Sequence, residues 1–241
     1  MTHYVLAMKW GTKYPALFVN RLYAMLRRNL TLPFELVCLT DDPAGIDPAV
    51  RCLPLPPLDL PPGLPERGWR KLTVFGDLGL SGTALFLDLD VVILRNIDHF
   101  FSYRADDRRR LYIIKDFKKR WRITGNSSVF RFELNAFPDL LPHFRHHFDD
   151  IRAAHRHEQS FLSAYLHGRD QLRYWPAGWC QSYKYHALYP PPLDWLLPPR
   201  QPDCDILIFH GEINPDRAIV GGGGKWYRHV KPAPWLADYW G

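Results

Sequence analysis

The chain has 241 residues, of which 46% are hydrophobic and 23% charged, and these values are typical of a globular domain with a sizeable buried core. No apolar run reaches the roughly 18 residues of a membrane-spanning helix, and the N-terminus lacks the basic start and apolar stretch of a secretory signal. The net charge is +6. The four cysteines form no Cys-x-x-Cys pair, and Cys38 and Cys52 fall in or beside apolar, strand-like runs, so we expect a protein of a reducing, cytoplasmic compartment.

The N-terminal part of the chain alternates strand and helix. Residues 4–8 form a short apolar run suited to a buried strand. Pro15 suits the first turn of a helix, and apolar residues recur near helical spacing over residues 17–26. Residues 34–39 predict a second strand. The loops after both strands are polar, and ligands of open α/β sheets bind at the carboxyl ends of strands.

The later part of the chain continues the alternation. Proline-rich residues 54–65 indicate an extended surface loop, and residues 69–78 have a helical pattern. Further strands are predicted over 84–87, 91–94, 111–114, 128–132 and 205–209, further helices over 137–148 and 158–166, and a short aromatic helix over 234–240. Residues 172–204 are rich in Trp, Tyr and Pro and show little regular pattern. This order predicts an α/β fold with a mostly parallel sheet.

Two carboxylates interrupt an apolar strand. Asp88 and Asp90 follow Leu85-Phe86-Leu87, where a charge is costly unless it is paired or bound to a metal ion. At a strand end followed by a turn, both can reach one hard divalent cation, Mn²⁺ or Mg²⁺. Such an ion would bridge the two phosphates of a nucleotide sugar and stabilise the leaving diphosphate. The alternative is a pair of solvent-facing aspartates.

A histidine follows another apolar strand. His210 stands directly after residues 205–209 and before Gly211, which lets the backbone approach a ligand closely. A lone histidine at such a place is more often structural, but beside the aspartate pair His210 becomes a candidate third metal ligand.

Two polar loops near the N-terminus are candidates for nucleotide binding. An aromatic ring can stack on a base, and a carboxylate can accept hydrogen bonds from a ribose. The residues proposed for these contacts are Trp10, Thr12, Lys13 and Tyr14 in the first loop and Thr40 and Asp41 in the second. For Trp10 simple packing is the alternative. The sequence contains no Gly-x-Gly-x-x-Gly and no Gly-Lys-Ser/Thr motif, which argues against dinucleotide oxidoreductases and P-loop kinases.

The order of these motifs resembles the GT-A-fold glycosyltransferases, in the family that contains glycogenin and the bacterial lipopolysaccharide galactosyltransferases. In that family a helix with a basic residue precedes the strand that carries Asp-x-Asp, and here Lys71 occupies that place. The resemblance spans roughly residues 4–215. It implies a single GT-A-like domain over residues 1–241, with a mixed, mostly parallel central sheet flanked by helices, a donor half of about residues 1–100 and an acceptor half of about 101–241.

The resemblance also implies roles for individual residues. Lys71 would reach the donor sugar or diphosphate, and Leu89 of the Asp-x-Asp motif would contact the donor. Asn126 would contact the sugar as the first residue of the family's Asn-x-Gly motif, although Ser128 stands where the family usually has glycine. Glu158-Gln159 matches the family's Asp-Gln pair near the reacting carbon. The family's phosphate-binding lysine is not at its usual place, and Arg217 or Lys225 would substitute for it.

The reaction that the resemblance implies is metal-dependent transfer from a nucleotide-diphosphate sugar, a UDP-sugar in the first instance, to an acceptor hydroxyl in glycan or surface polysaccharide synthesis. If configuration is retained, as in the family, Gln159 lies under the sugar; an inverting course needs a carboxylate base, and Glu158 is the candidate. The alternatives are a nucleotide-sugar hydrolase or a nucleotidyltransferase on a similar sheet, and a non-catalytic binding module.

Residues 104–122 are strongly basic. The simplest interpretation is a solvated loop, and the other is an acidic partner such as an anionic membrane surface on the inner face or a phosphate-rich acceptor. No nucleic-acid motif accompanies the charge, so we expect no nucleic-acid partner. The acceptor classes left open are a glycan, a lipid-linked acceptor and a protein. The histidine cluster around His143 and His147 is interpreted as solvated surface, because no glutamate stands beside it.

Overall fold

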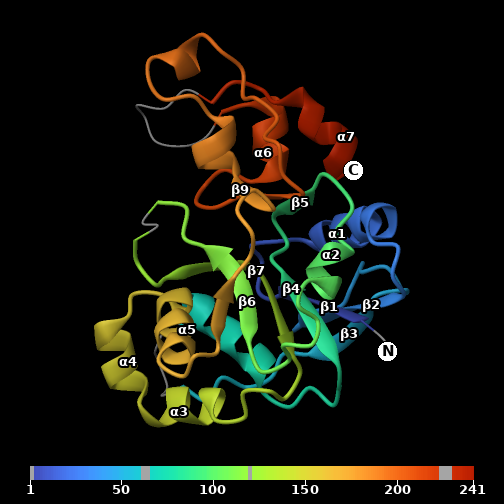
Figure 1. Cartoon of the computed structure of the whole chain (residues 1–241). Coiled ribbons are helices and arrows are strands. Elements are labelled where there is room, and N and C mark those ends of the chain that lie inside the picture. Colours follow the sequence, from blue (N-terminus) through green and yellow to red (C-terminus); the bar gives the residue numbers. More distant parts are fainter. Residues whose placement is uncertain (1–2, 61–65, 119–120, 223–229) are drawn as a thin grey trace.

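The structure is a computed structural model that describes the chain except residues 1–2, 61–65, 119–120 and 223–229. Seven strands form its main sheet, in the order β3-β2-β1-β4-β7-β6-β8 (Figure 1). These strands are β1 His3–Lys9, β2 Phe34–Thr40, β3 Arg51–Pro54, β4 Thr83–Leu87, β6 Leu111–Lys115, β7 Gly125–Glu133 and β8 Leu172–Tyr174. Strands β1 to β4 pair in parallel, as do β6 and β8, whereas β7 is antiparallel to both β4 and β6. The predicted mixed, mostly parallel sheet is therefore confirmed.

The chain also forms a second, smaller sheet. It consists of β5 (Val91–Ile93), β9 (Cys180–Ser182) and β10 (Ile206–Ile208), in the order β5-β10-β9. Strand β10 is antiparallel to β5 and parallel to β9. Because β4 belongs to the large sheet and β5 to the small one, the turn that carries Asp88 and Asp90 connects the two sheets.

Helices cover both faces of the main sheet. Alternate residues of a strand point to opposite faces, so Val5 and Ala7 of β1 join one core cluster and Leu6 and Met8 join the other. The first cluster includes residues of α1 (Ala16–Asn29), α2 (His99–Ser102), α6 (Pro215–Val220), η4 (Pro234–Leu236) and α7 (Ala237–Trp240). The second includes residues of η1 (Arg67–Phe75), α3 (Leu140–His146), α4 (Phe148–Ala154) and α5 (Glu158–His167). Both faces of the sheet are thus buried, as its apolar strands require.

Most predicted elements agree with the structure, but some differ, and the short helices α2 and α6 were not predicted. The helix expected over residues 137–148 is divided at His147 into α3 and α4. The region 172–204, expected to be irregular, contains β8, β9 and the short helices η2 (Tyr183–Ala187) and η3 (Leu193–Trp195). Strand β3 was not predicted. Within the part of the chain that the structure describes, none of the helices combines the length and the apolar character that crossing a bilayer requires.

Candidate active site

A cleft of about 940 Å³ lies where the chain leaves the carboxyl ends of β1, β4 and β10. The predicted residues that these strand ends bring to it are Trp10, Lys13, Tyr14, Asp88, Leu89, Asp90 and His210. Strand β7 runs antiparallel to β4, so its first residues adjoin the end of β4 and also enter the wall. The other walls come from η1, the β6–β7 loop, the start of β7, the N-terminus of α5 and η2, with Gly68, Lys71, Asp116, Phe117, Lys118, Asn126, Ser127, Ser128, His157, Glu158, Gln159 and Tyr185.

The ammonium group of Lys71 lies buried among carboxylates. Its Nζ is 2.6 Å from Oδ1 of Asp88 and donates to the backbone oxygen of Ser127 at 3.1 Å. Burial on its own would lower the pKa of Lys71, but the carboxylates of Asp88 and Glu158 outweigh that effect and raise the pKa above its usual value. Lys71 therefore keeps its charge and balances part of the negative charge of the cleft.

Asp90 stands beside Asp88 in the same turn. The hydroxyl of Tyr14 donates to Oδ2 of Asp90 at 2.6 Å, and burial raises the pKa of the Tyr14 phenol far above its usual value, so that it stays a donor. Burial and the charge of Asp88 raise the pKa of Asp90 to about 6, against the opposing effects of Tyr14, Lys13 and Lys71. A carboxylate whose ionisation is disfavoured by burial and by a neighbouring carboxylate, as that of Asp90 is, can be stabilised by a divalent cation.

His210 lines the same cleft from the end of β10. Its Nε2 and the Oγ of Ser182 are 2.7 Å apart, and its ring stacks on that of Phe117. Burial lowers the pKa of His210, so the imidazole is neutral, which is the form that binds metals. Among the described residues no three His, Cys, Asp or Glu side chains are gathered closely enough to hold a metal ion. The donor types fit Mn²⁺ or Mg²⁺, and their assembly around one ion stays a prediction.

Ser127 connects the catalytic candidates. Its hydroxyl donates to Oε1 of Glu158 at 2.8 Å, and its backbone N–H faces Oε1 of Gln159 at 3.4 Å. Its hydroxyl and carbonyl oxygens also accept from Lys71. On the other side of Glu158, a Cβ added to Gly68 would come within 2.7 Å of Oε2, so the carboxylate packs against the backbone of η1. Sequence reasoning assigned no role to Ser127.

Several predicted donor-binding residues lie elsewhere. Thr12 is exposed and is not part of the cleft wall. Thr40 is buried and closes a turn through hydrogen bonds with the backbone of Asp42, whereas Asp41 accepts from the N–H of Gly11 at 2.9 Å. Asp41 therefore ties the loop after β2 to the loop after β1.

The remaining predicted positions differ in how far they reach the cleft. Leu89 lines it, although its side chain is buried in the core. Asn126 also lines it and accepts from the N–H of Ser128 at 3.1 Å. Arg217 is exposed on α6 and does not line the cleft. Lys225 lies outside the described residues.

Sequence reasoning also missed the β6–β7 loop. Asp116, Phe117 and Lys118 follow β6 and line the cleft, as the loops after β1 and β4 do. Asp116 and Phe117 also line a neighbouring hollow of about 180 Å³, which Trp175 and Gln181 border. A polar segment directly after an apolar strand could have indicated this loop. Sequence reasoning instead treated these residues as part of the basic segment 104–122.

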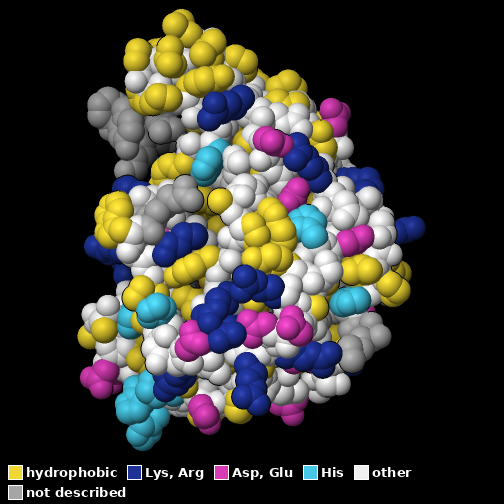
Figure 2. Space-filling model, in the orientation of Figure 1, with side chains coloured by type: hydrophobic (Ala, Val, Ile, Leu, Met, Phe, Trp, Pro, Cys, Tyr) yellow, Lys and Arg dark blue, Asp and Glu magenta, His cyan; other side chains and the backbone are white. Residues whose placement is uncertain are grey.

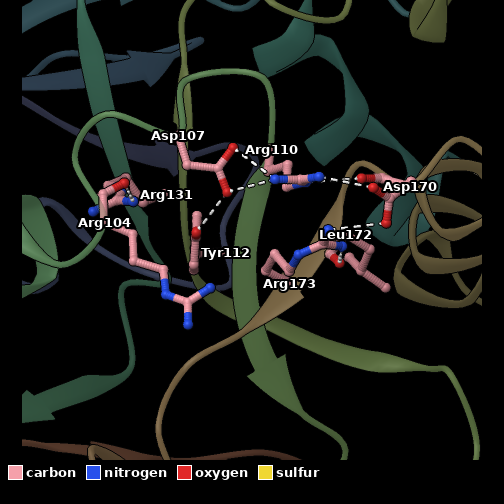
Figure 3. Close-up of polar contacts among 8 residues, drawn as sticks. All are labelled: Arg104, Asp107, Arg110, Tyr112, Arg131, Asp170, Leu172 and Arg173. Atoms are coloured by element: carbon pink, nitrogen blue, oxygen red, sulfur yellow. Dashed lines mark hydrogen bonds and ion pairs between the residues drawn. The ribbon is translucent and has the colours of Figure 1, made fainter.

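The predicted basic segment makes many internal contacts (Figure 3). Arg110 forms ion pairs with Asp107 at 3.1 Å and with Asp170 at 2.7 Å, and Tyr112 donates to Asp107 at 2.8 Å. Asp170 also pairs with Arg173 of β8 at 2.9 Å. These contacts give part of the segment a structural role, because they join the loop before β6 to the start of β8.

Arg131 of β7 lies buried behind this network. Its guanidinium donates to the backbone oxygens of Phe100, Phe101 and Tyr103 at 2.8, 3.1 and 2.7 Å, and more weakly to Arg104 at 3.4 Å. It also lies over the ring of Tyr112. Burial lowers the pKa of Arg131, and among the hydrogen bonds described none joins its guanidinium to a carboxylate. The dipoles of the carbonyl groups at the end of α2 therefore stabilise this buried charge.

Comparison with known proteins gives matches among solved structures. Neither the scan against protein-family models nor the search of curated proteins returns a match. The galactosyltransferase LgtC, solved in complex with donor and acceptor sugar analogs, is similar over 88% of each chain, with a TM-score of 0.62 and 14% identity. An active-site mutant of LgtC gives a TM-score of 0.58 at 14% identity over 88% of this chain and 89% of that one. The glycosyltransferase GlyE of Streptococcus pneumoniae TIGR4 gives 0.62 at 13% identity, over 88% of this chain and 56% of its own. At these identities the likeness shows the fold, and the chain has the GT-A-like fold of these glycosyltransferases.

Proposed function

We propose that this protein transfers a sugar from a nucleotide-diphosphate sugar to an acceptor hydroxyl. The observation that carries the proposal is the cleft at the strand ends, which brings Asp88, Asp90, Lys71, Glu158 and Gln159 together from distant parts of the sequence. Its volume of about 940 Å³ is large enough for a nucleotide sugar. The fold shared with LgtC, which was solved with donor and acceptor sugar analogs, supports the same reaction.

The donor is expected to lie along the side of the cleft formed by the loop after β1. Trp10 offers an aromatic face for a base, and the ammonium groups of Lys13 and Lys118 supply positive charge for a diphosphate. A UDP-sugar is the first candidate. Asn126, at the start of β7, lines the cleft, and its amide N–H would donate to a sugar hydroxyl while its oxygen accepts from Ser128.

Asp88, Asp90 and His210 are the residues that would hold Mn²⁺ or Mg²⁺. When bound, the ion would supply positive charge for the leaving nucleotide diphosphate. Lys71 adds a fixed positive charge within the same cleft, because its contact with Asp88 keeps it protonated there.

The acceptor oxygen would form a bond to the anomeric carbon as that carbon's bond to the diphosphate oxygen breaks. The proton of the acceptor hydroxyl goes to the leaving phosphate if configuration is retained, with Gln159 beneath the sugar, and to Glu158 if it is inverted. Both side chains line the cleft and are oriented by Ser127. Proton NMR of the fresh product distinguishes the two courses from the configuration of the new linkage.

The test is a donor panel. The protein is incubated with UDP- and GDP-sugars and Mn²⁺, with and without a mixture of acceptor glycans, and free nucleotide is measured. We expect release that EDTA abolishes, that Mn²⁺ restores and that Asp90→Ala lacks. Asp149→Ala, which changes an exposed carboxylate on α4, is the matched control and keeps the activity.

Three other outcomes have distinct meanings. Release that is equally fast without acceptor, with free sugar as product, would favour the alternative hydrolase. Transfer of a nucleotidyl group would favour the nucleotidyltransferase. If no nucleotide is released and no nucleotide sugar with Mn²⁺ raises the melting temperature, the proposed function is wrong and the cleft serves another ligand.

A further inference from the structure

Residues 190–199 form an apolar projection, which we name the tip. In Figure 1 it is the orange loop with a short helix at the upper end of the molecule, and Figure 2 shows hydrophobic side chains gathered there. Its large hydrophobic side chains are solvent-exposed: the exposed fraction is 43% for Leu193, 60% for Trp195, 70% for Leu196 and 41% for Leu197. Exposed prolines at 190–192 and 198 extend the apolar surface. Contiguous exposure of this kind marks an interaction site in a folded protein.

The tip is held in place by its backbone. Trp235 donates from Nε1 to the carbonyl of Pro199 at 3.1 Å, and just outside the tip Arg200 donates from Nε to the carbonyl of His186 at 2.6 Å. Lys231 donates from Nζ to the carbonyl of Leu196 at 2.9 Å. Because these bonds anchor the segment to the body of the protein, the outward position of Trp195 belongs to the fold.

Among the described residues, Lys231, which bonds to the tip, and Arg200, which directly follows it, are basic. The acidic residue within it, Asp194, is only 3% exposed, so its carboxylate is turned away from the surface. The basic side chains of Arg200 and Lys231 stand at its base, where Figure 2 also shows a basic side chain. A protruding group of Trp and Leu above a basic rim matches the interface of an anionic lipid bilayer, which takes apolar groups beneath its negatively charged headgroups.

We propose that the tip docks this protein on an anionic lipid surface, with Trp195 and Leu196 inserted and Arg200 and Lys231 at the phosphates. The projecting shape supports a lipid surface over a protein partner, because a stable protein interface needs a matching area of about 800 Å² on each side. The sequence pointed instead to residues 104–122 as the membrane contact. The tip continues directly from η2, whose Tyr185 lines the cleft, so docking would hold the cleft near lipid-linked acceptors. That last consequence rests on the proposed function, whereas docking does not.

The test uses the full chain and sedimentation with vesicles of phosphatidylcholine, with or without phosphatidylglycerol. We expect binding that needs phosphatidylglycerol and weakens with salt. The double variant Trp195→Ser, Leu196→Ser should lower the partition coefficient at least about tenfold. Leu17→Ser is the matched control, since Leu17 is 50% exposed on α1, and it should bind as the wild type does. Brominated lipid should quench tryptophan fluorescence less in Trp195→Phe than in the wild type.

Four results would contradict docking of the tip on a lipid surface. If the double variant binds vesicles as the wild type does, with an unchanged melting temperature, the tip is not the contact. If Arg109→Glu weakens binding and the double variant does not, the contact lies in residues 104–122. If the wild type does not bind vesicles, or if light scattering shows self-association that the double variant loses, the tip is not a lipid-docking surface. None of these measurements needs a nucleotide sugar, so they are separate from the test of the proposed function.

Discussion

Replacing Arg131 with methionine removes the guanidinium that donates hydrogen bonds to the backbone carbonyl groups at the end of α2. Three of its hydrogen bonds are 3.1 Å or shorter and go to the backbone oxygens of Phe100, Phe101 and Tyr103. At about 1.5–3 kcal/mol for each hydrogen bond from a charged group, the variant loses roughly 5–9 kcal/mol of interaction. Part is recovered, because methionine needs no desolvation of a charge and fills much of the same space. The three carbonyl oxygens left without this donor cost about 1–3 kcal/mol each, so after that recovery we expect a net loss of about 3–5 kcal/mol.

Urea denaturation, followed by circular dichroism, measures the loss in the free energy of unfolding, and thermal denaturation measures the change in melting temperature. The melting temperature should fall by roughly 6–20 °C in a chain of this size. Arg131→Lys keeps the charge but not the planar fork of donors, and it should lose less than Arg131→Met. Arg109→Met is the matched control, because Arg109 is exposed on the loop before β6, so a loss below about 1 kcal/mol is expected. If Arg131→Met also loses less than about 1 kcal/mol, the carbonyl groups do not depend on the guanidinium and the reasoning fails.

Two further predictions concern the cleft and the dependence of stability on pH. Gly68→Ala should displace the Glu158 carboxylate and lower the rate of transfer about tenfold or more, with little change in melting temperature. The control Gly168→Ala, whose added Cβ makes only ordinary contacts, should leave the rate unchanged. Equal rates in Gly68→Ala and the wild type would show that Glu158 needs no fixed position. Burial, with His147 adding, lowers the pKa of His143, so the unfolded chain binds a proton more readily and the stabilising effect of the neutral ring is lost as the pH falls. The free energy of unfolding should therefore decrease from about pH 7.5 to about pH 5.5, and His143→Gln should decrease less; an identical slope in the variant would contradict the assigned pKa.

The fold was predictable where hydrophobic patterns are long. Strand β4 and the strand after it are almost wholly apolar, and the two carboxylates between them mark the turn. Strand β3 has four residues with exposed ends and no apolar run, so nothing in Arg51–Pro54 indicates pairing with β2. The break at His147 was hidden because Phe144 and Phe148, on either side of it, bury their rings in the same core cluster and contact each other edge to face. A single periodic pattern fits one helix or two.

The candidate site was predictable in part for a similar reason. Polar residues after a strand are near the cleft, but the sequence does not show which of them face it. Trp10 and Tyr14 do, whereas Asp41 holds the loop of Gly11, and Thr40 supports its own turn. Lys118 was interpreted as part of a surface charge run because its neighbours in sequence are basic. Its place in the cleft wall depends on how the β6–β7 loop folds over the site, which no local pattern records.

Ser127 connects two segments that are far apart in the sequence, and this affects how substitutions in the cleft combine. Lys71, Glu158 and Gln159 all contact that one residue, through its hydroxyl, its carbonyl and its N–H. Residues that share a partner show interaction free energies of about 0.5–3 kcal/mol, so their single-variant effects do not add. A library that varies these positions one at a time would therefore score each as indispensable. Variation of all four together is the way to find other workable arrangements of this cleft.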